Sequence, residues 1–149
     1  MGRADDARAV VDSHLRMPSA ARILQGGNTL IACLAGQEAR AAALRDSGAT
    51  VLELPGQDGR VCLDSLMQAL GAHEINEVLV EAGAILNGAL LQRRLADELL
   101  LYYAPALLGG DARGMFTLAA LTEMGQRTDL EIVSLDRIGQ DIRIRARPR

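Results

Sequence analysis

The sequence predicts an α/β domain with a largely parallel central sheet flanked by helices. Apolar runs of strand length alternate with helical patterns along most of the 149 residues, and this alternation is typical of strand–helix–strand units. The pattern changes near the C-terminus, where residues 130–135 and 142–146 alternate apolar and polar positions on either side of Gly139. We therefore expect the domain to end in an antiparallel hairpin.

Five apolar runs are the expected strands of the parallel sheet. They span residues 8–12, 29–34, 50–54, 77–81 and 99–104. The last of these runs is nearly all apolar, as expected for a strand at the centre of a sheet that is covered on both faces. Pro105 follows it directly and is expected to end it.

Three helices are expected between these strands. Residues 37–47 are rich in Ala, Arg and Glu, and Gly48 stands where a glycine commonly ends a helix. Residues 63–70 place Leu or Met at the i, i+3, i+4 and i+7 positions, which gives one apolar helix face. Residues 83–94 are the third expected helix.

The composition excludes several classes of function. A net charge of −3 argues against a general nucleic-acid binder, and Tyr102, Tyr103 and Phe116 offer few platforms for base stacking. Cys33 and Cys62 have no metal or redox spacing, and with two histidines there is no zinc ligand set; we interpret both thiols as buried and reduced. No run approaches the roughly 18 apolar residues of a membrane span, and the N-terminus lacks the layout of a secretory signal. We expect a cytoplasmic protein that binds neither nucleic acid nor membrane.

The strongest local signal for a ligand site is the stretch 78–91, VLVEAGAILNGALL. A buried strand is expected to end in the carboxylate of Glu81, and a helix is expected to begin at Gly83. The first N–H groups of a helix have no acceptor within it and lie at the positive end of its dipole. Gly83 and Ala84 lack bulk, so a phosphate could approach these N–H groups closely.

The same stretch has a purely structural interpretation. Small residues at a strand-to-helix turn often serve packing, and Gly88 and Ala89 could keep the helix face thin or pack it closely. Glu81 could equally be a solvated acid or a partner for an arginine. The motif taken alone therefore supports an anion site only weakly.

Polar residues also follow the expected strand at 8–12. Ser13 could donate a hydrogen bond to a nucleotide, and Arg16 could pair with a phosphate; alternatively, Asp12 or Ser13 caps a local turn. On the last strand, three arginines line one side, and we interpret them as a solvated edge. They are Arg143, Arg145 and Arg147.

Several sequence blocks occur in a recognisable order: VVDS at 10–13 with Arg16 and Pro18, VEAG at 80–83 with Leu90 and Leu91, Asp97 and Glu98, YAP at 103–105, and LLGGDAR at 107–113. Together these blocks resemble a known family, the C-terminal reductase domain of the bifunctional riboflavin biosynthesis deaminase/reductase. The resemblance covers nearly the whole chain, and it implies a dihydrofolate-reductase-like fold.

The resemblance also implies an activity. Members of the family use NADPH to reduce 5-amino-6-(5-phosphoribosylamino)uracil at the sugar carbon C1′, which opens the ribose to a ribityl chain, and a homodimer is implied. Glu81 matches the family's substrate-binding glutamate, and Ser13 matches a serine that contacts NADPH. The segment that wraps NADPH matches Gly83, Ala84, Ile85, Leu86, Asn87, Gly88 and Ala89. No side chain is an obvious general acid, so we expect binding roles rather than a proton donor.

The N-terminal region departs from the family. Members carry a further segment with a strand and part of the pocket ahead of the VDS strand, often preceded by a zinc deaminase domain. We therefore expect residues 1–149 to be a single reductase domain, incomplete at its start and without a deaminase domain. The alternative function is a non-catalytic nucleotide-binding or oligomerisation module that keeps the fold; a reductase that acts on a pterin is a lesser alternative.

Overall fold

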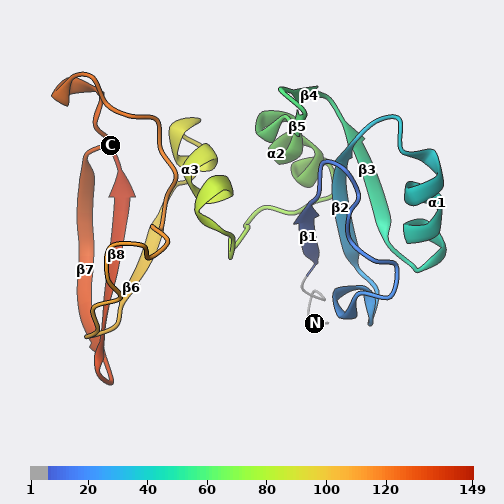
Figure 1. Cartoon of the computed structure of the whole chain (residues 1–149). Coiled ribbons are helices and arrows are strands. Elements are labelled where there is room, and N and C mark those ends of the chain that lie inside the picture. Colours follow the sequence, from blue (N-terminus) through green and yellow to red (C-terminus); the bar gives the residue numbers. More distant parts are fainter. Residues whose placement is uncertain (1–6) are drawn as a thin grey trace. The chain divides into compact units, whose positions relative to one another are not determined.

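The chain forms two compact units, one that runs to Val78 and one that comprises Leu79–Arg149 (Figure 1). The computed structural model describes residues 7–149. Each unit has its own main sheet. Within the described residues, no helix combines the length and the apolar character that a membrane span requires.

The first unit contains the parallel sheet that the sequence predicts. Strands β1 (Arg8–Val11), β2 (Thr29–Leu34) and β3 (Thr50–Leu54) pair in the order β1-β2-β3. The central strand β2 is almost entirely buried, with Ile31 and Cys33 fully inaccessible. Parallel strands that are buried on both faces are near-continuous apolar runs, which is why TLIACL predicted this strand correctly.

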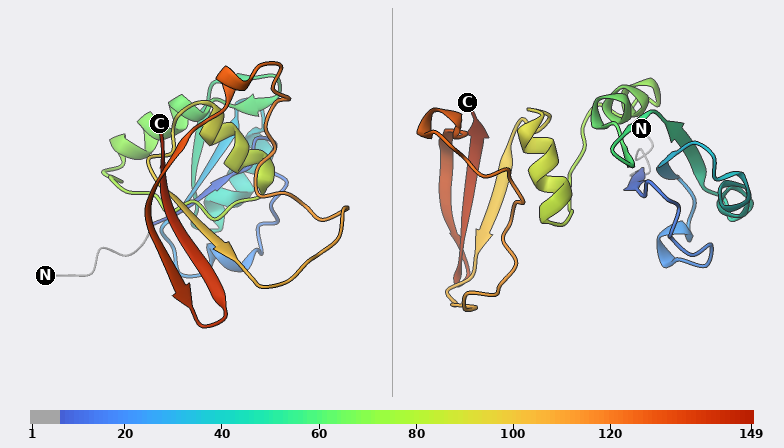
Figure 2. Two further views of the ribbon diagram at one scale, coloured as in Figure 1. Left: turned by 90° about the vertical axis from the view of Figure 1, so that its left-hand side faces the viewer. Right: turned by 45° about the horizontal axis from the view of Figure 1, so that its top comes forward.

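Helices flank this sheet on both sides (Figures 1 and 2). Helix α1 (Glu38–Asp46) buries Ala41 and Leu44, and α2 (Leu63–Ala72) buries Leu63, Leu66 and Leu70. A short 3-10 helix, η1 (Arg22–Leu24), lies in the connection from β1 to β2, and a small hairpin of β4 (Gly56–Gln57) and β5 (Arg60–Val61) precedes α2. The core on the α1 side is made of Leu15, Leu24, Ile31, Cys33, Ala41, Leu44, Ala49 and Val51.

The second unit contains an antiparallel sheet and one α-helix. Helix α3 (Ala84–Gln92) precedes β6 (Leu99–Tyr103), and the 3-10 helix η2 (Met124–Gln126) precedes the hairpin of β7 (Leu130–Ile138) and β8 (Asp141–Pro148). The strand order is β6-β8-β7. Gly139 adopts φ 64° in the hairpin turn, so the predicted C-terminal hairpin is confirmed.

Two of the predicted strands differ from the prediction. Residues 77–81 form no strand, and Leu79 is 74% exposed. The run β6 is a strand, but it lies at the edge of the antiparallel sheet and pairs only with β8, so Leu100 and Tyr102 are exposed. Apolar β-branched residues favour an extended backbone, but the partner that supplies the hydrogen bonds decides whether a strand forms and in which direction it runs.

The arginines of β8 do not mark an edge. β8 is the middle strand, and its arginines pair with acids on both sides: Arg143 with Asp136 at 2.9 Å, and Arg145 with Glu98 at 3.0 Å. The hydrogen bond from Arg143 lowers the pKa of the Asp136 carboxyl. The register between β7 and β8 shifts at a bulge between Ile132 and Ser134.

Candidate functional site

The start of helix α3 is open to a ligand. Gly83 is the residue before the first helical turn, with φ −80° and ψ 168°, and no side chain within residues 7–149 caps the helix. The first N–H groups therefore have no acceptor from the helix or from a capping side chain. The first turn holds no acidic residue, and a Cβ added at Gly83 would meet no heavy atom within 4 Å. This arrangement suits a phosphate.

Glu81 lies two residues before Gly83, in the extended segment that leads into α3. Its side chain is exposed, and within the described part of the chain it has no hydrogen bond or ion pair. The alternative that it pairs with an arginine is therefore not seen among residues 7–149. Asn87 holds the turn between Glu81 and the helix, because its Nδ2 donates to the carbonyl of Ala82 at 3.1 Å.

The predicted NADPH segment divides into an accessible part and a packed part. Ile85 is 58% exposed, whereas Gly88 is buried against the backbone of Thr117. A Cβ at Gly88 would overlap the Thr117 carbonyl oxygen, and the Thr117 N–H donates to the carbonyl of Ala84 at 2.8 Å. The packing thus supports the interpretation that Gly88 lacks a side chain so that α3 can pack closely against Thr117. The start of the helix remains open.

Ser13 lies in the first unit, directly after β1, at a junction of three segments. Its carbonyl accepts hydrogen bonds from the N–H of Leu34 at 3.1 Å and from Nε2 of Gln37 at 2.8 Å. Its Oγ accepts a hydrogen bond from the N–H of Val61 at 3.1 Å. The Ser13 hydroxyl can still donate its own hydrogen, at the carboxyl ends of β1 and β2 where open α/β sheets bind ligands.

Asp12 caps the turn that follows β1, and this was one of the two alternatives expected, a cap by Asp12 or by Ser13. Its Oδ2 accepts a hydrogen bond from the N–H of Met17 at 2.8 Å. Because Asp12 takes this role, Ser13 is not needed for it. Sequence reasoning missed Gln37, which also donates to the carbonyl of Leu34 at 3.1 Å. Its position one residue before α1 was the signal that could have indicated it.

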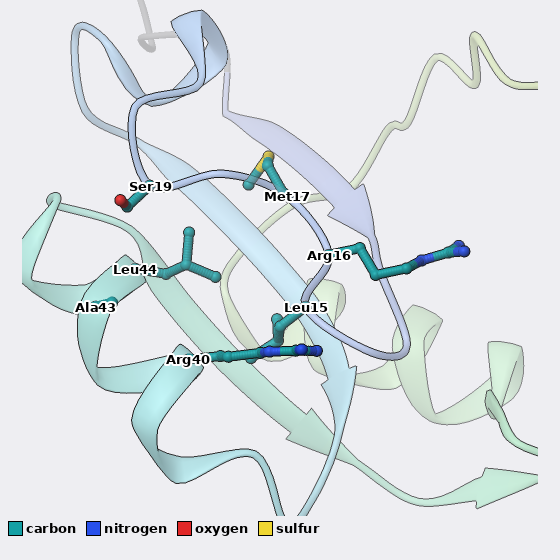
Figure 3. Close-up of a pocket in the computed structure, with 7 residues that line it drawn as sticks. All are labelled: Leu15, Arg16, Met17, Ser19, Arg40, Ala43 and Leu44. Atoms are coloured by element: carbon teal, nitrogen blue, oxygen red, sulfur yellow. The ribbon is translucent and has the colours of Figure 1, made fainter.

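A cavity of about 400 Å³ lies between the loop after β1 and helix α1 (Figure 3). The sequence singled out Arg16 in this loop, but it gave no reason to place Arg40 of α1 opposite. The residues that line the cavity are Leu15, Arg16, Met17, Ser19, Arg40, Ala43 and Leu44.

The cysteines do not form a site with other ligand residues. Within residues 7–149, no group of three His, Cys, Asp or Glu side chains is placed to hold a metal ion. Burial raises the pKa of the Cys33 thiol, and a hydrogen bond with Ser65 lowers the pKa of the half-buried Cys62 thiol. Of the two thiols expected to be buried, only Cys33 is fully so.

Comparison with known proteins identifies the family. Residues 3–144 match the RibD C-terminal domain family. The chain belongs to this family. Its sequence is 38% identical to the riboflavin biosynthesis protein RibD of Escherichia coli (strain K12) over 138 residues, which are 91% of this chain and 36% of that protein.

Two further proteins that are similar to this chain support the same family. The 5-amino-6-(5-phosphoribosylamino)uracil reductase of Buchnera aphidicola subsp. Acyrthosiphon pisum is 34% identical over 90 residues, which are 60% of this chain and 44% of that protein. A structure of Acinetobacter baumannii RibD has a TM-score of 0.81 at 35% identity, and the match covers 95% of this chain and 37% of that chain. This chain therefore spans little more than a third of the RibD relatives. The predicted family and fold class are confirmed.

Proposed function

We propose that this chain is an NADPH-dependent reductase of riboflavin biosynthesis, which reduces 5-amino-6-(5-phosphoribosylamino)uracil to its ribitylamino product. The observation that carries the proposal is the uncapped start of α3, with Glu81 two residues before it, inside the matched RibD C-terminal region. The open helix start can bind the phosphates of a cofactor. The carboxylate of Glu81, which has no partner among the described residues, can accept hydrogen bonds from a substrate rich in hydroxyl and N–H donors.

The residues present fit NADPH. The N–H groups at the start of α3 would hold its phosphates, since Gly83 leaves the approach open and no acidic side chain in the first turn repels them. We also propose that the Ser13 hydroxyl donates a hydrogen bond to the cofactor. Bound NADPH supplies the hydride that reduces the substrate.

Glu81 would bind the substrate rather than transfer a proton. An ionised carboxylate only accepts hydrogen bonds, so it suits the hydroxyl and N–H groups of a ribosylamino-uracil. We assign no general acid, because hydride transfer depends largely on holding donor and acceptor in the reacting geometry. We further propose that the protein is a cytoplasmic homodimer.

The substitution Gly83→Val tests the cofactor site without disturbing the fold. The backbone angles of Gly83 are open to any residue, and its added Cβ meets no protein atom, so the variant should stay folded. Its side chain would stand in front of the first N–H groups and weaken NADPH binding by about tenfold or more, the effect of losing hydrogen bonds to a charged group. Titration of NADPH, followed by its fluorescence, measures the dissociation constant.

Gly125→Val is the matched control, because Gly125 also has open space around its Cβ position and belongs to η2. It should bind NADPH as the unmodified chain does. A chain that fails to bind NADPH, or a Gly83→Val variant that binds it equally well, contradicts the cofactor proposal. An assay with the uracil substrate decides the activity: NADPH binding without turnover would select the non-catalytic module.

A further inference from the structure

The position of the Glu81 carboxylate depends on the backbone that carries it. Glu81 is exposed, and within the described residues its side chain makes no hydrogen bond or ion pair. Residues 79–82 form no strand, so no ladder of hydrogen bonds fixes their backbone. A group that holds a substrate for hydride transfer must nevertheless stand in a defined place, because a displacement of about 1 Å can lower a rate by about a hundredfold.

A single hydrogen bond ties residues 79–82 to the rest of the chain that the structure describes. Nδ2 of Asn87 donates it to the carbonyl of Ala82 at 3.1 Å. Asn87 also holds the next carbonyl, because its backbone N–H donates to the carbonyl of Gly83 at 3.1 Å. Asn87 therefore fixes two consecutive carbonyl groups, and Glu81 directly precedes the first of them.

The place of Asn87 in α3 explains how its side chain reaches Ala82. Helical side chains point toward the N-terminus of their helix, so a short side chain near the first turn can meet the residues that lead into the helix. Asn carries N–H donors on such a short side chain. Its neighbours Ile85, Leu86 and Ala89 have apolar side chains and cannot make this bond.

Asn87 is attached to a firm base, because the helix around it is packed. Gly88 is buried against the backbone of Thr117, and the Thr117 N–H donates to the carbonyl of Ala84 at 2.8 Å. Contacts thus run from the packed part of α3 through Asn87 to the peptide group next to Glu81.

We propose that Asn87 is a positioning residue of the substrate site: its bond to Ala82 sets where the Glu81 carboxylate stands relative to the start of α3. The substrate held by Glu81 is thereby aligned with the cofactor whose phosphates bind at the helix start. Asn87 acts through Glu81, and not through a contact between its side chain and NADPH. The inference rests on the proposed function and adds the residue that connects its two binding places.

Asn87→Ala removes the bond and should leave the fold intact, because alanine is the better helix former. Calorimetric titration of the uracil substrate into the chain loaded with NADP⁺ should show binding that is about threefold to tenfold weaker, the usual effect of losing one hydrogen bond. The dissociation constant of NADPH should stay unchanged. In a Glu81→Gln background the same substitution should have little further effect, since residues that act through one another are not additive.

Nuclear magnetic resonance relaxation measures the positioning directly and without a ligand. The backbone order parameters of Glu81 and Ala82 should be about 0.85 in the unmodified chain and fall toward about 0.6 in Asn87→Ala. Gln92→Ala, which removes an exposed amide at the end of α3, is the matched control. It should change neither the order parameters nor the affinity for the substrate.

The outcomes separate this inference from the reductase proposal. Unchanged order parameters or unchanged substrate affinity in Asn87→Ala overturns the inference and leaves the reductase proposal intact. A matching loss of NADPH affinity also overturns it, because that loss would place Asn87 against the cofactor. The expected losses in a chain that binds the substrate without reducing it would uphold the role of Asn87 and reject the reductase, whereas a chain that does not bind the substrate overturns both.

Discussion

Gly83 and Gly88 lie on one helical segment but lack a side chain for different physical reasons. Gly83 has open space before it, and Gly88 is pressed against the Thr117 carbonyl. The sequence predicted the helix start and the smallness of both positions, because these are local properties. It could not separate their roles, since the partner of Gly88 lies far along the chain.

Glu81 provides a prediction at the scale of a single residue. Glu81→Gln keeps the size of the side chain and removes its charge, so we expect kcat/KM for the uracil substrate to fall by about tenfold or more. The dissociation constant of NADPH should change little. Glu77→Gln, an exposed carboxylate of the same segment, is the control and should retain both values. An equal loss of substrate turnover and NADPH affinity in Glu81→Gln would place Glu81 in the cofactor site instead.

The individual elements show where sequence patterns are sufficient. Apolar runs located β1, β2 and β3, and the period-two alternation located the hairpin of β7 and β8. The same reasoning failed at residues 77–81, which have the composition of a strand but no partner strand in the structure. A strand depends on hydrogen bonds from elsewhere in the chain, whereas a helix supplies its own, so all three predicted helices formed while one predicted strand did not.

The packing of α3 predicts whether a substitution at Gly88 raises or lowers the free energy of unfolding. Gly→Ala inside a helix ordinarily stabilises a protein by up to about 1 kcal/mol. At Gly88 the new methyl group would overlap the Thr117 carbonyl, so we expect Gly88→Ala to lower the free energy of unfolding by about 1–3 kcal/mol. Gly71→Ala in α2 has open space and should instead raise it slightly. Denaturant unfolding of both variants measures the difference, and stabilisation by Gly88→Ala would show that Thr117 yields easily.

At the scale of the whole molecule, each of the two units has its own main sheet and its own proposed binding residues. Ser13 belongs to the first unit, and Glu81 and the start of α3 belong to the second. The α/β class followed from the alternation of patterns, whereas the division at Val78 has no compositional signal such as a Gly- or Pro-rich linker. The prediction of a single domain over residues 1–149 stays a prediction.

Exposed apolar side chains in the second unit motivate a prediction about assembly. Ile132, Leu135 and Ile142 are each at least 44% exposed and belong to the same face of its sheet, and contiguous apolar surface is typical of protein interfaces. We expect the chain to form a homodimer, whose mass is twice the 15.9 kDa of one chain. Size-exclusion chromatography with light scattering measures this mass, and a monomer at micromolar concentration would contradict the expectation.

The bulge in β7 has a consequence for how this protein can vary in length. By inserting one extra residue after Ile132, it changes which later positions face the arginine row, and so places Asp136 opposite Arg143. Without it, strict alternation would bring Leu135 opposite Arg143 and turn Asp136 to the apolar face. Insertions or deletions in β7 before Asp136 should therefore be tolerated when they comprise two residues. An insertion or deletion of one residue would exchange the polar and apolar faces of the half of the hairpin that lies nearest its turn.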